Sequence, residues 1–177
     1  KQSISAGTSD IIFNSGIDST YKGYLITLND IHTSNDSPDL QFSAATDGAT
    51  WNVSKTAGTN EMLASKNGSY GQMNYQTDGK ALSDTGNHKI YRDIGNASTE
   101  NMSAWCYIWD PANTTTYKAY MMRTFGSVND IGGTTDGTIA QFVGGILETT
   151  SAVNGFRFNL NSGNFDDGIV TMYGITH

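Results

Sequence analysis

The chain has 177 residues, with ten Lys and Arg against seventeen Asp and Glu, for a formal net charge of −7. Charged residues make up 15% of it, below the ~25% typical of soluble domains. So few and so scattered cationic groups exclude a nucleic-acid-binding surface, which needs Lys and Arg to neutralise phosphates. No apolar run reaches the ~18 residues that a membrane-spanning helix requires, so no membrane contact is expected.

Hydrophobic residues account for 37% of the chain, enough to build a real core. Helical bundles and coiled coils are disfavoured because the polarity comes from Asn, Ser, Thr and 20 glycines rather than from Glu and Lys. We expect a single domain over residues 21–177. Residues 1–20 are expected to form an N-terminal arm or a first edge strand.

Alternation of apolar and polar residues with a period of two dominates the chain and predicts β-strands. The segment 60–66 is the best helical candidate, and it is short enough to be a single turn. The predicted strands, in chain order, are 24–28, 40–44, 51–53, 70–75, 89–94, 102–109, 116–124, 138–147, 155–160 and 169–175.

Turn-forming residues separate these strands. The triplet Thr-Asp-Gly occurs three times, ending at Gly48, Gly79 and Gly137, and it suits tight turns between antiparallel strands. Asn161 to Gly168 is expected to be a longer loop. Strands of this number and spacing predict an all-β fold, an antiparallel β-sandwich of jelly-roll-like type with short helices or none.

Catalytic patterns are absent from the sequence. Cys106 is the one cysteine, and its strand places it with Met102, Ala104 and Ile108 on one face, which predicts a core residue rather than a nucleophile. No Gly-x-Ser-x-Gly, P-loop or dinucleotide fingerprint is present, and the three histidines have no metal-ligand spacing. We therefore expect a protein that is not an enzyme and needs no cofactor.

Two Asx-rich loops carry oxygen ligands of the kind that Ca²⁺ prefers. They contain Asp36 and Asp39 in one loop and Asp166 and Asp167 in the other. Neither loop has the spacing of an EF-hand, and such turns are stable without a metal. These four aspartates are weak calcium candidates, and no metal site is predicted.

The segment 102–109 carries three large aromatic residues on the face opposite Cys106, namely Trp105, Tyr107 and Trp109. Three interpretations are open. The aromatic face belongs to the core and the small residues point outward, or it is buried by a protein partner, or it stacks on sugar rings.

Two stretches resemble a known family. The first is STYKGYLITLNDI at 19–31 with LQFSAATDGATW at 40–51, and the second is VNGFRFNLNSGNFDDGIVTMYGI at 153–175. Both are similar to a β-sandwich module of virion structural proteins in tailed bacteriophages, of the head decoration or fibre type. Ala45 stands where the family has Ser, and Met172 stands where Leu is usual. The match covers about a third of the chain and leaves 55–150 unmatched.

The resemblance implies a non-enzymatic virion structural protein, assembled in the cytoplasm of a bacterial host. The size and the absence of heptads favour a capsid decoration or cement subunit, whose partners would be the major capsid protein, other virion proteins and further copies of itself, a trimer by preference. In that setting Ile11, Ile12 and Phe13 are expected to dock the arm onto the particle. The alternative is a carbohydrate-binding module that uses Trp105, Tyr107 and Trp109 on a host-surface glycan.

Overall fold

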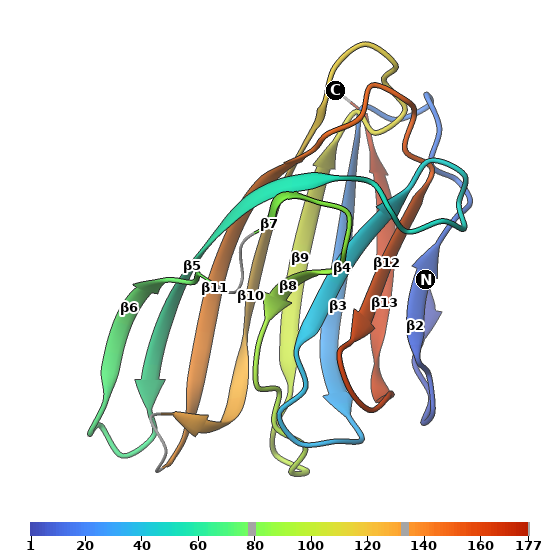
Figure 1. Cartoon of the computed structure of the whole chain (residues 1–177). Coiled ribbons are helices and arrows are strands. Elements are labelled where there is room, and N and C mark those ends of the chain that lie inside the picture. The colour runs from blue at the N-terminus through green and yellow to red at the C-terminus, as the bar shows by residue number, and fades with distance from the viewer. Residues whose placement is uncertain (78–80, 132–134, 177) are drawn as a thin grey trace.

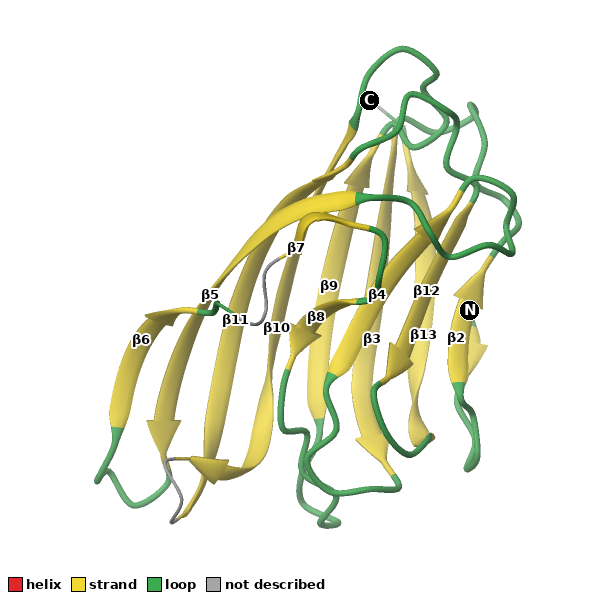
Figure 2. Cartoon of the chain, in the orientation of Figure 1, coloured by secondary structure: helices red, strands yellow, loops and turns green. Residues whose placement is uncertain are grey.

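A computed structural model describes residues 1–77, 81–131 and 135–176 (Figures 1 and 2). Within these ranges all regular elements are strands. They are β1 (Gln2–Ser3), β2 (Asp10–Phe13), β3 (Gly23–Thr33), β4 (Leu40–Ala45), β5 (Lys55–Ser65), β6 (Gly71–Tyr75), β7 (Ala81–Asp84), β8 (His88–Tyr91), β9 (Met102–Trp109), β10 (Lys118–Ile131), β11 (Thr135–Leu147), β12 (Gly155–Leu160) and β13 (Phe165–Ile175).

The strands form two antiparallel sheets that pack face to face. The large sheet has the order β1-β13-β3-β9-β10-β11-β5-β6, and β7 also pairs with β5. The small sheet has the order β2-β12-β4-β8. Figure 1 shows the small sheet in front of one half of the large sheet, with β11, β5 and β6 extending beyond it. The predicted antiparallel β-sandwich is thus confirmed.

Consecutive parts of the chain alternate between the sheets, as in a jelly roll. Strand β2 is in the small sheet, β3 in the large and β4 in the small; β5 to β7 are in the large and β8 is in the small. The meander β9 to β11 returns to the large sheet before β12 and β13 take one sheet each. This alternation leaves a continuous layer of side chains between the sheets.

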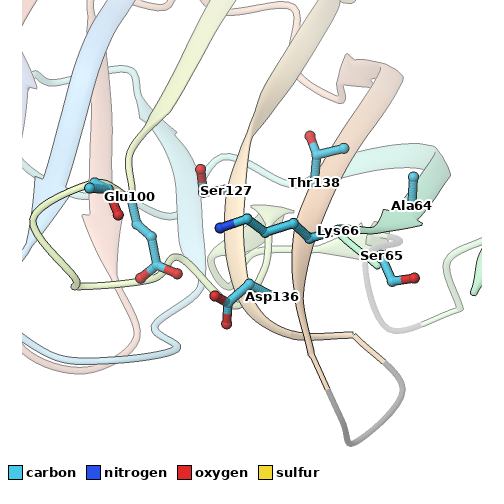
Figure 3. Close-up of a pocket in the computed structure, with 9 residues that line it drawn as sticks. Ala64, Ser65, Lys66, Glu100, Ser127, Asp136 and Thr138 are labelled. Carbon is cyan, nitrogen blue, oxygen red and sulfur yellow. The ribbon is translucent and has the colours of Figure 1, made fainter. Parts of the chain in front are cut away.

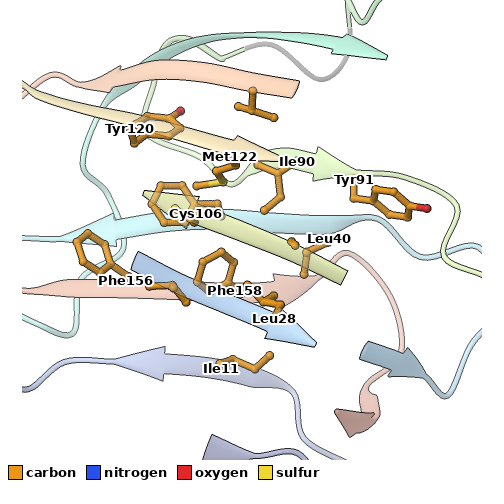
Figure 4. Packing of buried hydrophobic residues seen from close by; sticks show 14 of the residues in the cluster. Ile11, Leu28, Leu40, Ile90, Tyr91, Cys106, Tyr120, Met122, Phe156 and Phe158 are labelled. Atoms are coloured by element: carbon orange, nitrogen blue, oxygen red, sulfur yellow. The ribbon is translucent and has the colours of Figure 1, made fainter. Parts of the chain in front are cut away.

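The core lies where the small sheet covers the large one (Figure 4). Phe42 on β4 is its centre, with ring centroids 5.4 Å from Tyr120, 5.4 Å from Phe158 and 6.2 Å from Phe156. Cys106 is buried as predicted, and burial raises the pKa of its thiol. A protonated, buried thiol is a packing residue and not a nucleophile.

The predicted strands with buried apolar residues at every second position are confirmed most closely, and the segment with polar residues at those positions was predicted wrongly. The bounds of β9 and β12 match the predicted 102–109 and 155–160. The helical turn predicted for 60–66 is wrong, because residues 55–65 form β5 and pair with β11. Residues 51–53 are not a strand, and the connection from β12 to β13 is shorter than predicted because β13 begins at Phe165.

Residues 1–20 carry two edge strands. Gln2 pairs with Val170 of β13 and Phe13 pairs with Phe156 of β12, so each sheet gains a strand from this segment. Ile11 and Phe13 are 1% and 7% exposed and belong to the core. The prediction that Ile11 and Phe13 form a docking surface is therefore wrong, because both are buried. Of the three predicted residues, Ile12 alone is half-buried and faces away from the core.

Two buried lysines bind backbone carbonyl groups of the loops at one end of the sandwich. The Lys118 ammonium donates to the carbonyl oxygens of Thr116 at 3.0 Å, Thr149 at 2.7 Å and Ser151 at 2.7 Å. The Lys55 ammonium, in register with Lys118 across β11, donates to the carbonyls of Val53, Asp84 and Gly86. A buried ammonium is tolerated because its donors are satisfied.

Beyond the small sheet, a polar network covers the inner face of β5 and β11. Glu61 on β5 is fully buried, and its carboxylate accepts from Arg92 Nε at 2.8 Å and Nη2 at 3.0 Å. The amides of Gln141 and Gln76 donate to the same carboxylate at 2.6 Å and 2.5 Å. This network fastens the segment after β8 and the turn after β6 to the sheet.

We predict that Glu61→Ala lowers the free energy of unfolding by about 3–5 kcal/mol, nearer the lower value because Arg92 is partly exposed. The substitution leaves Nε and Nη2 of Arg92 and two amides without their acceptor, whereas Nη1 of Arg92 keeps its bond to Asp93. Asn60→Ala, at the neighbouring outward position, should change stability by less than about 0.5 kcal/mol. Urea unfolding measures both values, and equal effects of the two substitutions would contradict a buried network centred on Glu61.

Candidate functional site: the outer face of the large sheet

The face of the large sheet that points away from the small one is apolar along its middle. On β9 the residues Met102, Ala104, Cys106 and Ile108 are buried, so Trp105, Tyr107 and Trp109 point outward. The register continues this outward set across the sheet. We define the outer apolar face as Leu25, Met62, Met73, Tyr75, Trp105, Tyr107, Trp109, Met121, Phe125, Phe142, Ile146 and Tyr173.

Several of these side chains are largely open to solvent. Met73 is 74% exposed, Tyr75 55% and Met62 52%, and Phe125 and Phe142 are each nearly half exposed. Met62 is paired directly with Met73 across β5 and β6. Trp105, Phe142 and Tyr75 share one row, which Arg123 and Asn60 interrupt. The exposed apolar groups therefore lie close together rather than as scattered single residues. Contiguous apolar patches of this kind mark contact surfaces, whereas isolated exposed residues need no explanation.

Glycines shape the surface around the aromatic strand. Tyr107 packs against Trp109 with ring centroids 4.4 Å apart and ring planes inclined by 49°. A Cβ at Gly23 would overlap the Tyr107 ring, so this glycine is what allows the ring to lie flat on β3. Gly144 on β11 faces open space, so the surface is lower there than at its neighbours.

A shallow depression of about 170 Å³ lies on this face near β6. Its walls come from β5, β6, β10 and β11, and they combine thioether, aromatic and guanidinium groups. The lining residues are Asn60, Met62, Met73, Arg123, Ala140, Gln141 and Phe142.

Electrostatically, the middle of the face is almost neutral. The outer apolar face runs from Tyr173 on β13 to Tyr75 on β6. Among the described residues that lie in the same cross-strand rows as its members, Arg123 is the one charged side chain. Asp136 and Asp167 are near the beginnings of β11 and β13, and Asp30 lies at the irregular pairing between β3 and β9. The face therefore offers a broad apolar area with one positive charge near its centre.

Of the three interpretations of Trp105, Tyr107 and Trp109, the structure removes the first. These side chains are not part of the core, since the opposite face of β9 fills it. Contact with a protein and contact with a sugar remain as interpretations. Sequence reasoning identified the three aromatic residues on β9 but missed their neighbours on β5, β6, β10 and β11, which only the register brings together.

The calcium candidates lie in two loops that are neighbours in space. The backbone N–H of Asp39 donates to Asn161 Oδ1 at 2.8 Å, and that of Asn164 donates to Ser34 Oγ at 3.1 Å. Asp39 is 3.6 Å from Lys89, and its pKa is raised because burial outweighs the lysine. Asp36 is exposed in its loop and Asp167 is exposed near the start of β13. No three carboxylate, histidine or cysteine groups converge on one point among the described residues.

Asp166 instead pairs with His32, a residue that sequence reasoning left without a role. His32 Nδ1 is 2.7 Å from Asp166 Oδ1, and Nε2 is 3.2 Å from the carbonyl oxygen of Ala97. Burial lowers the pKa of His32, but the hydrogen bonds to Asp166 and Ala97 outweigh it and the net shift is upward. The pair borders a polar cavity of about 440 Å³ that Asp30, Glu100 and Asp167 also line.

A second polar cavity, of about 390 Å³, opens where β5 ends and β11 begins (Figure 3). Lys66 and Asp136 enter it from these two strands, which are joined there by a 2.8 Å backbone hydrogen bond, and Glu100 enters from the segment before β9. Its groups are of mixed charge, and no activated nucleophile stands among them.

The described part of the chain contains no helix that is long and apolar enough to cross a membrane. No family model matches the chain, and no curated protein matches it. A solved structure titled "Structure of Drosophila C2-DSL-EGF1" is weakly similar, at 6% identity and a TM-score of 0.15, over 78% of this chain and 65% of that one. A likeness at this level carries no argument about fold or function.

We predict that His32→Gln destabilises the protein more at low pH than at high pH. A pKa above the usual 6.5 means that the folded state holds the proton more tightly than the unfolded chain. This stabilisation is complete below about pH 6.5 and is lost as the pH rises through the folded-state pKa. Urea unfolding at about pH 5.5 and pH 8.5 measures the difference.

The matched control is Ser98→Ala, an exposed position beside the same cavity, whose effect on stability should not depend on pH. A difference between wild-type and His32→Gln protein that stays constant, or grows toward high pH, would rule out the His32–Asp166 pair as its source.

Proposed function

We propose that this protein is a non-enzymatic structural subunit of a tailed-bacteriophage virion, a decoration or cement protein that binds the outer surface of the capsid. The observation that carries the proposal is the outer apolar face, a broad and nearly uncharged surface with exposed aromatic and thioether side chains. Such a surface suits a lasting contact with another protein, because desolvating it carries little electrostatic cost.

The dimensions of the face support a stable contact. From β13 to β6 it crosses seven strands, about 30 Å at the usual strand spacing, and its four rows cover about 20 Å along the strands. That footprint is of the same order as the ~800 Å² that each partner buries in a standard protein interface. The exposed apolar area is thus large enough for a partner protein rather than for a small ligand alone.

The virion setting rests on the resemblance of residues 19–51 and 153–175 to phage structural proteins. In the fold these two distant segments are neighbours in both sheets: β12 pairs with β4, as Phe158 with Phe42, and β13 pairs with β3, as Thr171 with Thr27. The resemblance therefore covers one connected part of the sandwich. This unity supports reading both stretches as a single module.

We also propose that the subunit is a homo-oligomer with closed symmetry, a trimer by preference. Strand β6 supports self-association because it is an edge of the large sheet that carries neither a charged residue nor a proline. Edges of this kind pair readily with another chain, and proteins that avoid pairing usually place Lys or Pro there.

The proposal is tested on purified phage particles. We expect the protein on the capsid in many copies by electron microscopy and quantitative mass spectrometry. Phe142→Asp replaces an aromatic side chain of the face, 45% exposed, with a carboxylate directly opposite Arg123. It should reduce occupancy about tenfold or more without unfolding the subunit, because it removes apolar contact area and engages the one guanidinium of the face.

Ser162→Asp adds the same charge in the exposed loop between β12 and β13, and its occupancy should equal that of the wild type. Absence of the wild-type protein from the particles would overturn the proposed function. Equal occupancy of the Phe142→Asp and Ser162→Asp variants would remove the outer apolar face from it.

One observation favours a second candidate, a carbohydrate-binding module. The Tyr107 and Trp109 rings lie 4.4 Å apart on the surface, and Trp109 is 38% exposed, so an aromatic platform is open to a sugar ring. A glycan array tests this candidate: binding by the wild type that is lost in both Trp105→Ala and Trp109→Ala supports it. No glycan signal, or a signal unchanged in these variants, counts against it.

A further inference from the structure

Arg123 occupies an unusual position at the middle of the outer apolar face. It points outward from β10 and is exposed, and none of the described residues forms a hydrogen bond or an ion pair with its guanidinium. Other arginines of the chain are engaged: Arg92 binds Glu61, and Arg157 binds Ser43 and Asn87. The five donors of Arg123 are thus free for a group outside the chain.

The neighbours of Arg123 are apolar on both sides. In the register of the sheet Trp105 of β9 lies directly opposite on one side and Phe142 of β11 on the other, while Phe125 follows two residues along on the same face. Arg123 also forms one wall of the depression of about 170 Å³, with Met62 and Met73 opposite. A charge in such surroundings gains strength when a partner excludes water from it.

We infer that Arg123 is the anchoring residue of the outer apolar face and that its ligand is a carboxylate of the partner protein, an Asp or Glu side chain or a chain terminus, seated in this depression. The inference rests on the proposed function, because it names the chemistry of the partner at that same surface. A guanidinium binds a carboxylate through two parallel N–H···O bonds. Trp105, Phe142 and Met62 then pack against the apolar residues that flank the acid.

The size of the depression favours a side chain over a small molecule. Pockets for drug-sized ligands measure about 300–1,000 Å³, and the depression is well below that range. Arginine with surrounding aromatic residues is also the composition that dominates binding energy in protein interfaces. A phosphate-rich partner is disfavoured, because Arg123 stands alone among the central rows and the whole chain carries a net charge of −7.

The same charge argues against a second copy as the occupant of this face. If two copies stacked through the face about a two-fold axis at its centre, the two Arg123 side chains would meet, and no carboxylate of the central rows is there to separate them. Like charges in an apolar contact are costly. The face is therefore built for a different chain, and self-association is left to other surfaces such as the β6 edge.

A random twelve-residue peptide library displayed on filamentous phage tests the inference with the purified, full-length protein. We expect the peptides enriched on the wild type to share an Asp, a Glu or a C-terminal carboxylate next to aromatic or aliphatic residues. Synthetic versions should bind with at least tenfold lower affinity to Arg123→Gln, and the peptide in which the shared acid is replaced by its amide should lose as much.

The matched control is Lys1→Gln, which removes one positive charge at an exposed residue next to the β1 edge, four strands away from β10. It should bind the peptides as the wild type does. Crosslinking the bound peptide to Trp105 or Phe142 positions, replaced singly by a photoreactive phenylalanine, identifies the face.

Enrichment of no peptide, or of peptides without a common acid, overturns the inference, and so does equal binding by Arg123→Gln. The outcome is separable from that of the particle experiment. If Phe142→Asp loses capsid occupancy while Arg123→Gln keeps it, the proposed function stands and the carboxylate anchor falls. If acidic peptides bind through Arg123 but the protein is absent from particles, the anchor stands and the virion role falls.

Discussion

The large sheet is about twice as wide as the small sheet that covers it, and the rest of the molecule depends on how the uncovered surface is satisfied. On the inner side, where β5 and β11 extend past β8, apolar packing gives way to the Glu61 network with Arg92, Gln141 and Gln76. The segment between β8 and β9 is held against the sheet by these bonds. The inner face of the large sheet is therefore stabilised by polar contacts near β5 and β11 and by the aromatic core where the small sheet covers it.

On the outer side no element of the described chain covers the sheet, although many of the side chains there are apolar. Strands usually bury apolar side chains and expose polar ones, but two strands here do the reverse at neighbouring positions. Strand β5 buries Glu61 and exposes Met62, and β10 buries Thr124 and exposes Phe125. An arrangement of this kind is unfavourable for an isolated monomer, since it leaves hydrophobic surface in water. It becomes favourable when a partner takes the place of the missing layer, and the unpaired guanidinium of Arg123 gives that layer a fixed point.

The sequence predicted the fold class and the strands whose alternation is apolar, and β9 is the clearest of them. It did not predict β5, because the inward positions Lys55, Thr59 and Glu61 are polar and their partners lie far away in the chain. For the same reason the site was found only in part. The aromatic residues of β9 are adjacent in sequence, whereas Phe142, Met62 and Arg123 join them through pairings across β10, β11 and β5 that no local pattern records.

The Lys118 ammonium has a consequence for how such a protein changes over time. It holds the loops after β9 and after β11 by their main-chain oxygens at Thr116, Thr149 and Ser151, and every amino acid supplies such an oxygen. Side-chain substitutions in these loops therefore leave the hydrogen bonds of Lys118 in place. This end of the sandwich can therefore accept new exposed side chains without any change to the strands that form the outer apolar face.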